Sequence, residues 1–475
     1  MRGDPKEMTS AMTDRLAPLD VSFLYLEEAT TPMHVGGVAI FQAPEQDSFD
    51  HDKLVSLIEQ RIGLVPRYRQ KIKWVPGHLA SPVWVDDSHF DLAYHIRRSA
   101  LPRPGSEAQL HELVGRLMSR RLDRGRPLWE MYLVEGLTGG RIALIYKTHH
   151  AMVDGVSAVD IAQVILDLTP EPRKVPQDAW APHPEPKPVD LVVEAVTDFI
   201  RQPTELIEAI RNGVNDATAT AVKIACHAGG LLAYARTAVR PPPETPLNVD
   251  IGEQRRFAVA RTELDDYKRV RKMHGGTVND VVLATVAGAL RSWLMTRGEP
   301  VNGKTVIRAM VPVSVRTQNE QGGLGNRVSS YFVDLPVGEP DPLRRLREVN
   351  FTMRTHKEAG QSVGADVLVR LSGFAPPTLH SMGARAASGL SRRLFNVVVT
   401  NVPGPQFPLY AGGARMLEVF PVVPLAKGQA LSIGLTSYNG GVYYGLNADR
   451  DAMRDVDVIC QLIEESLAEL VDTVA

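Results

Sequence analysis

Cysteine is almost absent from this sequence, because Cys226 and Cys460 are the only two among 475 residues. Two cysteines so far apart in the chain exclude a disulfide framework and a metal cluster held by thiolates. Sparse cysteine is also typical of a reducing compartment, so we expect a cytoplasmic protein.

An excess of either charge is also missing. The chain has 53 Lys and Arg against 55 Asp and Glu, which gives a formal net charge of −2. Proteins that bind nucleic acid need a basic excess or a basic stripe to meet the phosphates, and the sequence has neither. The charge pattern therefore argues against a nucleic-acid partner.

Long apolar runs do not occur either. No uninterrupted stretch reaches about 18 apolar residues, so we predict no transmembrane helix. The N-terminal residues, MRGDPKEMTSAMTDRLAP, contain no apolar core of the kind that signal peptides carry. We therefore expect neither secretion by a standard signal nor a segment that spans a membrane.

The remaining composition is typical of a folded globular protein, with 44% hydrophobic and 23% charged residues. The length predicts two domains. From Leu16 to about Leu168, short β-branched runs such as GGVAIF and RIALIY alternate with helical patterns such as LVSLIEQRI. A similar pattern runs from Phe257 to the end, so we predict two α/β halves.

The middle of the chain differs from both halves. Residues 169–190 are dense in proline and lack periodicity, which predicts a surface linker. A helical stripe follows, and then an apolar stretch at 217–239 that is either a helix packed on a domain or a helix lying on a membrane surface. We therefore expect an N-terminal half at 1–170, a linker with connecting helices at 171–250, and a C-terminal half at 251–475.

The stretch GEPVNGKT, residues 298–305, fits the Walker A pattern of nucleotide-binding loops. That chemistry requires a strand before the loop and a helix after it, whereas here a helical pattern precedes the loop and a strand pattern follows it. We therefore predict an ordinary helix-to-strand loop, with Gly303 in a positive-φ turn.

The stretch YKTHHAMVDGVSAVD, residues 146–160, contains the most distinctive group of reactive side chains. The run IALIY before it predicts a buried strand, and the apolar spacing at 161–168 predicts a helix after it. His149, His150, Asp154 and Gly155 should thus lie on a strand-to-helix loop, where rigid elements hold functional groups at a cleft edge. Asp154 could fix the shape of this loop by accepting backbone N–H bonds or by pairing with an arginine.

Three interpretations of the two histidines compete. On an extended backbone neighbouring side chains point in opposite directions, so only one histidine can face a given cavity. A metal site would need at least three converging ligands, and the sequence supplies only a partial set. The pair could instead be purely structural. In the third interpretation one neutral imidazole is a general base that takes a proton from a hydroxyl or amine, which typically contributes roughly 10² to 10⁴ in rate.

Several motifs carry a resemblance to known enzymes. HHAMVDG fits HHxxxDG, the motif of the coenzyme A-dependent acyltransferase superfamily that includes chloramphenicol acetyltransferase, carnitine acyltransferases and peptide-synthetase condensation domains. The other matching stretches are LAPLDVSFLYLEEATTPMHVGGVAIF near the start, LDRGRPLWEMYLVEGL from Leu122, TVNDVVLATVAGALR from Thr277, VPVSVR from Val311, GNRVS from Gly325 and NVPGP from Asn401. Together they resemble the bacterial, mycobacterial-type wax ester synthase/acyl-CoA:diacylglycerol acyltransferase family, over most of the chain outside the linker and middle helices.

The resemblance implies a fold and an activity. The fold would be two chloramphenicol-acetyltransferase-like α/β sandwiches that face each other, with the base at their interface in a channel reached by CoA and acceptor from opposite faces. The activity would be transfer of a long-chain fatty acyl group from acyl-CoA to diacylglycerol, giving triacylglycerol, with long-chain alcohols as further acceptors that give wax esters. The resemblance implies no metal. It implies no cofactor either, because acyl-CoA is a substrate. Such substrates reside in membranes or lipid droplets, so we expect peripheral association with these surfaces.

The resemblance also implies roles for single residues. His150, the second histidine of the motif, would be the catalytic base, His149 and Asp154 would be mainly structural, and Gly155 would give the loop its turn. The PLW motif, Pro127, Leu128 and Trp129, would pack the core near the active-site channel. Asn279 and Asp280 match the ND motif, and we expect both to cap the long helix that follows.

Two other functions stay open on the sequence alone. One is a condensation-type acyltransferase that takes its acyl group from a carrier-protein thioester. The other is a non-catalytic lipid-binding member of the family, although the intact His150 and Asp154 count against it.

Overall fold

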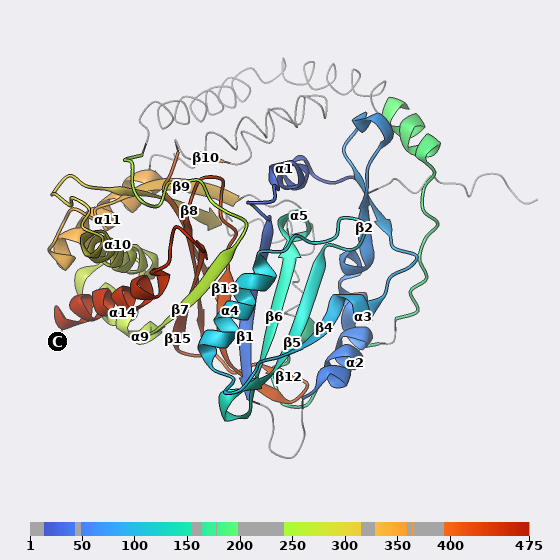
Figure 1. Ribbon diagram of the computed structural model, residues 1–475, viewed down its shortest axis with the longest axis horizontal. Coiled ribbons are helices and arrows are strands. Elements are labelled where there is room, and N and C mark those ends of the chain that lie inside the picture. Colours follow the sequence, from blue (N-terminus) through green and yellow to red (C-terminus); the bar gives the residue numbers. More distant parts are fainter. Residues whose placement is uncertain are drawn as a thin grey trace, which may run out of the picture.

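Two large β-sheets with flanking helices form the protein (Figure 1). The computed structural model describes residues 14–42, 49–153, 164–176, 178–197, 242–314, 328–358, 363–364 and 394–474. Within these residues the chain has the mixed α/β architecture and the two-domain arrangement that the sequence predicted.

The first sheet has six strands in the order β12-β13-β1-β6-β5-β4. Its strands are β1 (His34–Gln42), β4 (Ile96–Ala100), β5 (Trp129–Leu137), β6 (Arg141–His149), β12 (Tyr410–Ala411) and β13 (Ala414–Val422). Neighbours run antiparallel except β4 and β5, which are parallel. β5 and β6 are buried along most of their length, which shows that both faces of the sheet are covered there.

Short helices and a small hairpin surround this sheet. They are α1 (Pro18–Leu26), α2 (His51–Arg61), α3 (Leu92–His95), α4 (Glu107–Met118), α5 (His150–Val153), η1 (Ile62–Leu64), η2 (Pro66–Arg69), η3 (Pro76–His78), η4 (Thr138–Gly140), β2 (Gln70–Lys73) and β3 (Val83–Asp86). α4 begins with a capping box of Ser106 and Gln109, and its buried face repeats every three or four residues, at Leu110, Leu113 and Leu117.

The second sheet has seven strands in the order β10-β9-β8-β11-β14-β15-β7. Its strands are β7 (Arg255–Glu263), β8 (Ile307–Ser314), β9 (Val328–Leu335), β10 (Val363–Gly364), β11 (Val397–Pro403), β14 (Leu431–Tyr438) and β15 (Gly441–Asp449), and its helices are α9 (Leu264–His274), α10 (Val278–Thr296), α11 (Pro342–Glu358) and α14 (Val456–Asp472). Figure 1 shows α10, α11 and α14 on the side of this sheet that faces away from the first sheet.

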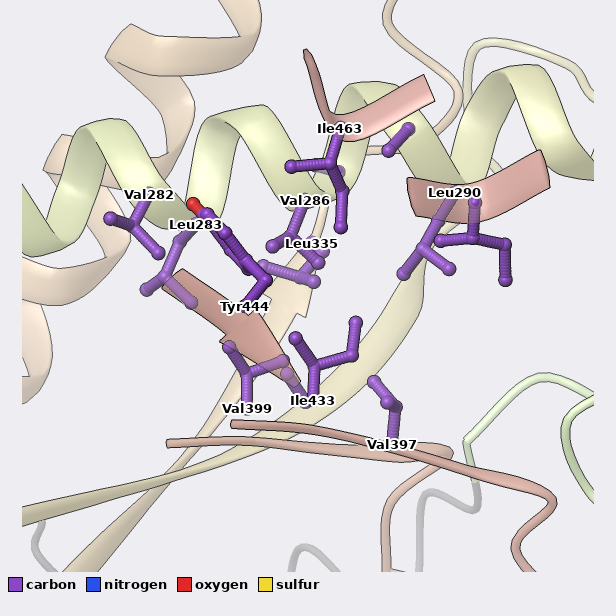
Figure 2. Packing of buried hydrophobic residues seen from close by; sticks show 14 of the residues in the cluster. Val282, Leu283, Val286, Leu290, Leu335, Val397, Val399, Ile433, Tyr444 and Ile463 are labelled. Atoms are coloured by element: carbon purple, nitrogen blue, oxygen red, sulfur yellow. The ribbon is translucent and has the colours of Figure 1, made fainter. Parts of the chain in front are cut away.

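The largest apolar core fills the space between α10 and the second sheet. Figure 2 shows Val282, Val286 and Leu290 of α10 directed toward strand residues such as Val399 and Ile433. The spacing of these helix residues, four apart, places them on one face, which explains why this apolar sequence folds as a helix laid across a sheet.

The two halves are interlocked rather than simply adjacent. β12 and β13 come from the predicted C-terminal half, yet β13 pairs antiparallel with β1 in the first sheet. α4 of the first half packs on β7 of the second, where a Cβ on Gly115 would lie 2.7 Å from the backbone oxygen of Arg255. Arg261 of β7 also forms ion pairs with Glu107 of α4 and Glu418 of β13. The domain boundaries stay a prediction, and this exchange shows that the sheets do not follow them.

The proline-rich linker lies along the first half. In the described part of residues 169–190 the backbone is irregular up to 187, as predicted for a linker. Lys73 bonds to the backbone oxygen of Pro186, and Asp86 accepts from the backbone of His183. A helical segment at 188–197 follows and packs Leu191 on the β2–β3 hairpin. The predicted helices at 198–241, including the apolar stretch 217–239, lie outside the described residues.

The Walker-like stretch 298–305 connects the end of α10 to β8, so the predicted helix-to-strand order is confirmed. The prediction for Gly303 is wrong, because the glycine with positive φ in this loop is Gly298, at φ 73°, directly after the helix. In the part of the chain that the structure describes, no helix combines the length and apolarity that crossing a membrane requires.

Candidate active site

The two histidines of the motif lie where a strand changes into a helix. His149 is the last residue of β6, and His150 is the first residue of α5, which packs against α1 (Figure 1). The His149 backbone N–H donates to the Leu128 oxygen at 2.9 Å, and the His150 N–H donates to the Met33 oxygen at 2.8 Å. Each histidine is therefore held by a backbone hydrogen bond to a different segment of the chain.

His149 is completely buried and acts as the N-cap of α5. Its Nδ1 accepts the backbone N–H of Ala151 at 3.1 Å, which satisfies a donor that the helix leaves unpaired. Burial lowers the pKa of His149 to about 3, although the nearby Glu27 opposes this shift. His149 is therefore neutral near pH 7. Because Nδ1 is an acceptor, the proton resides on Nε2, which lies 3.7 Å from Glu27 Oε1.

His150 has a different environment. It is only partly buried, and its ring stacks on Phe23 of α1 with 3.9 Å between ring centroids and an angle of 24° between the planes. The stacking restricts the ring plane of His150, while the backbone bond to Met33 restricts its position. One histidine is thus used for structure, and the other keeps access to its surroundings.

The rest of the HHxxxDG motif can be followed only in part. Asp154 and Gly155 lie outside the described residues, so their roles stay predictions. Of the helix expected at 161–168, Val164 is helical and buried, whereas Leu168 is 69% exposed and lies beyond the helix, which corrects the predicted apolar face. Arg61 of α2 donates to the Val164 backbone oxygen at 3.1 Å and so holds this helical residue in place.

A buried carboxylate behind the histidines was missed by the sequence analysis. Glu27 follows α1, and its Oε2 accepts two bonds from Arg124, at 3.0 Å from Nε and 2.7 Å from Nη2. Oε1 accepts the Met33 N–H at 3.3 Å and lies 3.4 Å from His34 Nε2. Burial alone would raise the pKa of Glu27, but the bond with His34 and the neighbouring His149 and Arg124 outweigh it and lower the pKa to about 2.

No local pattern marks Glu27, since Arg124 is 97 positions away in the chain. The available signal was the register of the strands, because β1 pairs with β6 and places His34 opposite His149. We call the group of Glu27, His34, Arg124 and His149 the Glu27 cluster. Within the described residues, no group of three or more His, Cys, Asp and Glu side chains is arranged to hold a metal ion.

A second buried polar cluster lies on the same sheet without direct contact to the histidines among its described hydrogen bonds. Glu130 accepts from Tyr132 at 2.7 Å and from Arg97 at 3.1 Å, and its carboxylate lies 3.2 Å from Lys147 Nζ. Lys147 also donates to the backbone oxygen of Arg120 after α4. Burial lowers the pKa of Lys147, although Glu130 opposes the shift. The bonds of Lys147 to the end of α4 attach this helix to the sheet.

The PLW residues lie in the core beneath the motif. Leu128 and Trp129 are buried, and the Trp129 indole N–H donates to the Tyr68 backbone oxygen at 2.8 Å. The ring of Trp129 also stacks on His95, with 4.6 Å between centroids. Since the Leu128 oxygen receives the His149 N–H, Pro127 to Trp129 supports the strand end that carries the histidines.

Asn279 and Asp280 of the ND motif make different contacts. Asp280 completes a capping box with Thr277 at the start of α10, as expected. Asn279 takes no part in this cap, so the capping role predicted for it is wrong. Its Oδ1 instead accepts a bond of 3.3 Å from Asn401 of the NVPGP stretch on β11. Asn279 thus joins two of the motifs that are distant in the sequence.

Comparison with known proteins identifies the family. Residues 16–282 match the model of the wax ester synthase/diacylglycerol acyltransferase catalytic domain, and residues 324–471 match the WS/DGAT C-terminal domain. The chain belongs to the wax ester synthase/diacylglycerol acyltransferase family. The probable diacylglycerol O-acyltransferase tgs1 of Mycobacterium tuberculosis is 33% identical over 468 residues, which is 96% of both chains. The enzyme is thus an acyltransferase of this family.

Solved structures agree with this assignment. The wax ester synthase/diacylglycerol acyltransferase from Marinobacter aquaeolei VT8 matches with a TM-score of 0.67 and 31% identity, covering 97% of this enzyme and 99% of that chain. The first condensation domain of the calcium-dependent antibiotic synthetase matches with a TM-score of 0.57 at 15% identity, covering 98% and 97%, which shows a shared fold alone. The predicted family and fold are therefore confirmed.

Proposed function

We propose that this enzyme transfers a long-chain fatty acyl group from acyl-CoA to diacylglycerol to make triacylglycerol, with long-chain alcohols as further acceptors, and that His150 is the general base. The observation that carries the proposal is the contrast between two adjacent histidines. His149 has no exposed side-chain surface, and both its ring nitrogens face other parts of the enzyme, whereas His150 is only partly buried.

The chemistry requires one base and an activated acyl donor. A neutral imidazole of His150 would take the proton of the acceptor hydroxyl as its oxygen attacks the thioester carbonyl. A new C–O bond forms, the C–S bond breaks, and His150 returns the proton to the departing CoA thiolate. The thioester is already activated, so the reaction needs no acylated enzyme nucleophile and no cofactor.

His149 is poorly suited to be the base. Its Nδ1 lone pair is used by the Ala151 N–H, and its pKa of about 3 gives the ring little affinity for another proton near neutral pH. Of the two motif histidines, His150 is the one whose side chain is only partly buried, so we assign the proton transfer to His150. This division of labour supports the roles that the family resemblance implied.

The lipid substrates also imply a surface on which the enzyme works. We propose peripheral association with membranes or lipid droplets. On the helical segment 188–197, Leu191 and Ala195 pack against the β2–β3 hairpin while Val189 and Val193 are exposed. Exposed apolar side chains on one helix face suit insertion between lipid headgroups.

The test supplies purified enzyme with radiolabelled palmitoyl-CoA and diolein, hexadecanol or no acceptor, beside His150→Ala. We expect labelled triacylglycerol with diolein and its loss in the variant, while circular dichroism and the thermal midpoint show intact folding. Full activity of His150→Ala would remove His150 from the role of base. If wild-type enzyme makes no ester from acyl-CoA, an acylated carrier protein is supplied as the donor, and activity there alone would overturn the choice of acyl-CoA.

A further inference from the structure

Glu27 is a carboxylate buried in the place where the motif histidines are anchored. Its side chain, which follows directly on α1, is 1% exposed. A carboxylate is costly to bury unless hydrogen bonds and opposite charge compensate for the lost water. Arg124 supplies both with its two bonds to Oε2. The other oxygen, Oε1, lies near the Met33 N–H and His149 Nε2.

Two paths connect Glu27 Oε1 with the first turn of α5. In the first path, Oε1 accepts the Met33 N–H at 3.3 Å, and the Met33 carbonyl accepts the His150 N–H at 2.8 Å. In the second path, Oε1 lies 3.7 Å from His149 Nε2, and His149 Nδ1 accepts the Ala151 N–H at 3.1 Å. The backbone N–H groups of the first two helix residues are therefore held by groups that Glu27 organises.

The negative charge of Glu27, 3.7 Å from His149 Nε2, also favours one tautomer of His149. A neutral imidazole with its proton on Nε2 presents a positive N–H end to the carboxylate, whereas the other tautomer would present a lone pair. Only the Nε2–H tautomer leaves Nδ1 free to accept the Ala151 N–H. The charge of Glu27 and the cap of α5 therefore favour the same tautomer of His149.

We propose that Glu27 is a positioning residue for the base, which fixes the His149 tautomer and the Met33 carbonyl and so holds His150 in its reactive position. This inference rests on the proposed role of His150. Glu27 itself need not touch a substrate. Its effect should appear in the chemical step, because a base displaced by a fraction of an ångström transfers protons poorly while substrates still bind.

The decisive variant is Glu27→Gln, which keeps the size of the side chain and removes its charge. The amide can donate to His149 Nε2, which would move the ring proton to Nδ1 and break the cap on Ala151. The matched control is Glu130→Gln in the second buried cluster, which removes a buried carboxylate of the same sheet that accepts from Tyr132 and Arg97. His150→Ala is assayed in parallel to test the proposed function itself.

We expect Glu27→Gln to lower kcat by about 10- to 100-fold and to leave KM for palmitoyl-CoA and diolein within about twofold. The acid limb of the pH profile of kcat/KM should move to lower pH, because removal of a buried negative charge disfavours protonation of a neighbouring base. Glu130→Gln should lower the thermal midpoint without either kinetic change. All assays run below the midpoint of the least stable variant.

The outcomes separate the two hypotheses. Should His150→Ala keep its activity, the proposed base is wrong, and the positioning role of Glu27 is wrong with it. If His150→Ala is inactive, His150 keeps its role as base. The inference about Glu27 would then be overturned if Glu27→Gln lowered kcat no more than Glu130→Gln does. An acid limb that does not move in Glu27→Gln would overturn it as well, since a purely structural carboxylate would leave the pH profile unchanged.

Discussion

Mild acid should destabilise this enzyme through His149. Burial lowers the pKa of His149 from 6.5 to about 3, so between these pH values the unfolded chain binds a proton that the folded enzyme does not. The stability that depends on neutral His149 is complete above 6.5 and is lost progressively as pH falls toward about 3. At about pH 5 the free energy of unfolding is lower by on the order of 2 kcal/mol, because each pH unit below 6.5 removes about 1.4 kcal/mol of it.

The substitution that isolates this effect is His149→Asn. Asparagine does not titrate, and its side-chain oxygen can still accept the Ala151 N–H at the N-cap of α5. Urea unfolding of both proteins is followed at about pH 7 and about pH 5. Between these two pH values the free energy of the first unfolding transition should fall in both proteins. The fall in the variant should be smaller than in the wild-type enzyme by about 2 kcal/mol. A buried histidine outside the Glu27 cluster, such as His95, contributes equally to both proteins and cancels.

The control is His78→Asn, because His78 is an exposed histidine in a positive-φ position that asparagine tolerates. It should keep the wild-type dependence on pH. If His149→Asn and wild type lose the same free energy of unfolding between the two pH values, then His149 is not kept neutral by burial, and the account of the cap is refuted.

Three further predictions concern packing and surface contacts. Trp129→Ala should lower the free energy of unfolding by about 3–5 kcal/mol in urea denaturation, because it empties a buried site and leaves the Tyr68 carbonyl without its indole donor; an effect below about 1 kcal/mol would contradict this packing. Gly115→Val should separate α4 from β7 and lower the thermal midpoint, since even a Cβ would lie 2.7 Å from the Arg255 oxygen; an unchanged midpoint would show that this contact is absent. Val193→Asp should weaken sedimentation with diolein-containing vesicles while leaving the thermal midpoint unchanged; undiminished binding would exclude this surface.

Local patterns predicted the elements well where short-range forces decide the structure. The apolar run IALIY forms β6 with both faces covered, and Asp280 caps α10, because such features depend on neighbours within a few residues. The order of helix and strand around the Walker-like stretch followed from the same periodicity. Asn279 was predicted wrongly, since its partner Asn401 is 122 positions away and nothing local indicates that contact.

The sequence by itself determined the α/β class, the family and the position of two histidines at the end of a strand, because periodicity and motif spacing are properties of neighbouring residues. The tertiary structure decided what the two histidines can do. Strand pairing places His34 opposite His149, and the ion pair of Glu27 with Arg124 lies beside this buried histidine, while His150 stays partly exposed against Phe23 of α1. It also decided that β13 completes the first sheet. Burial and nearby charges keep His149 neutral, and neither can be read from the order of residues alone.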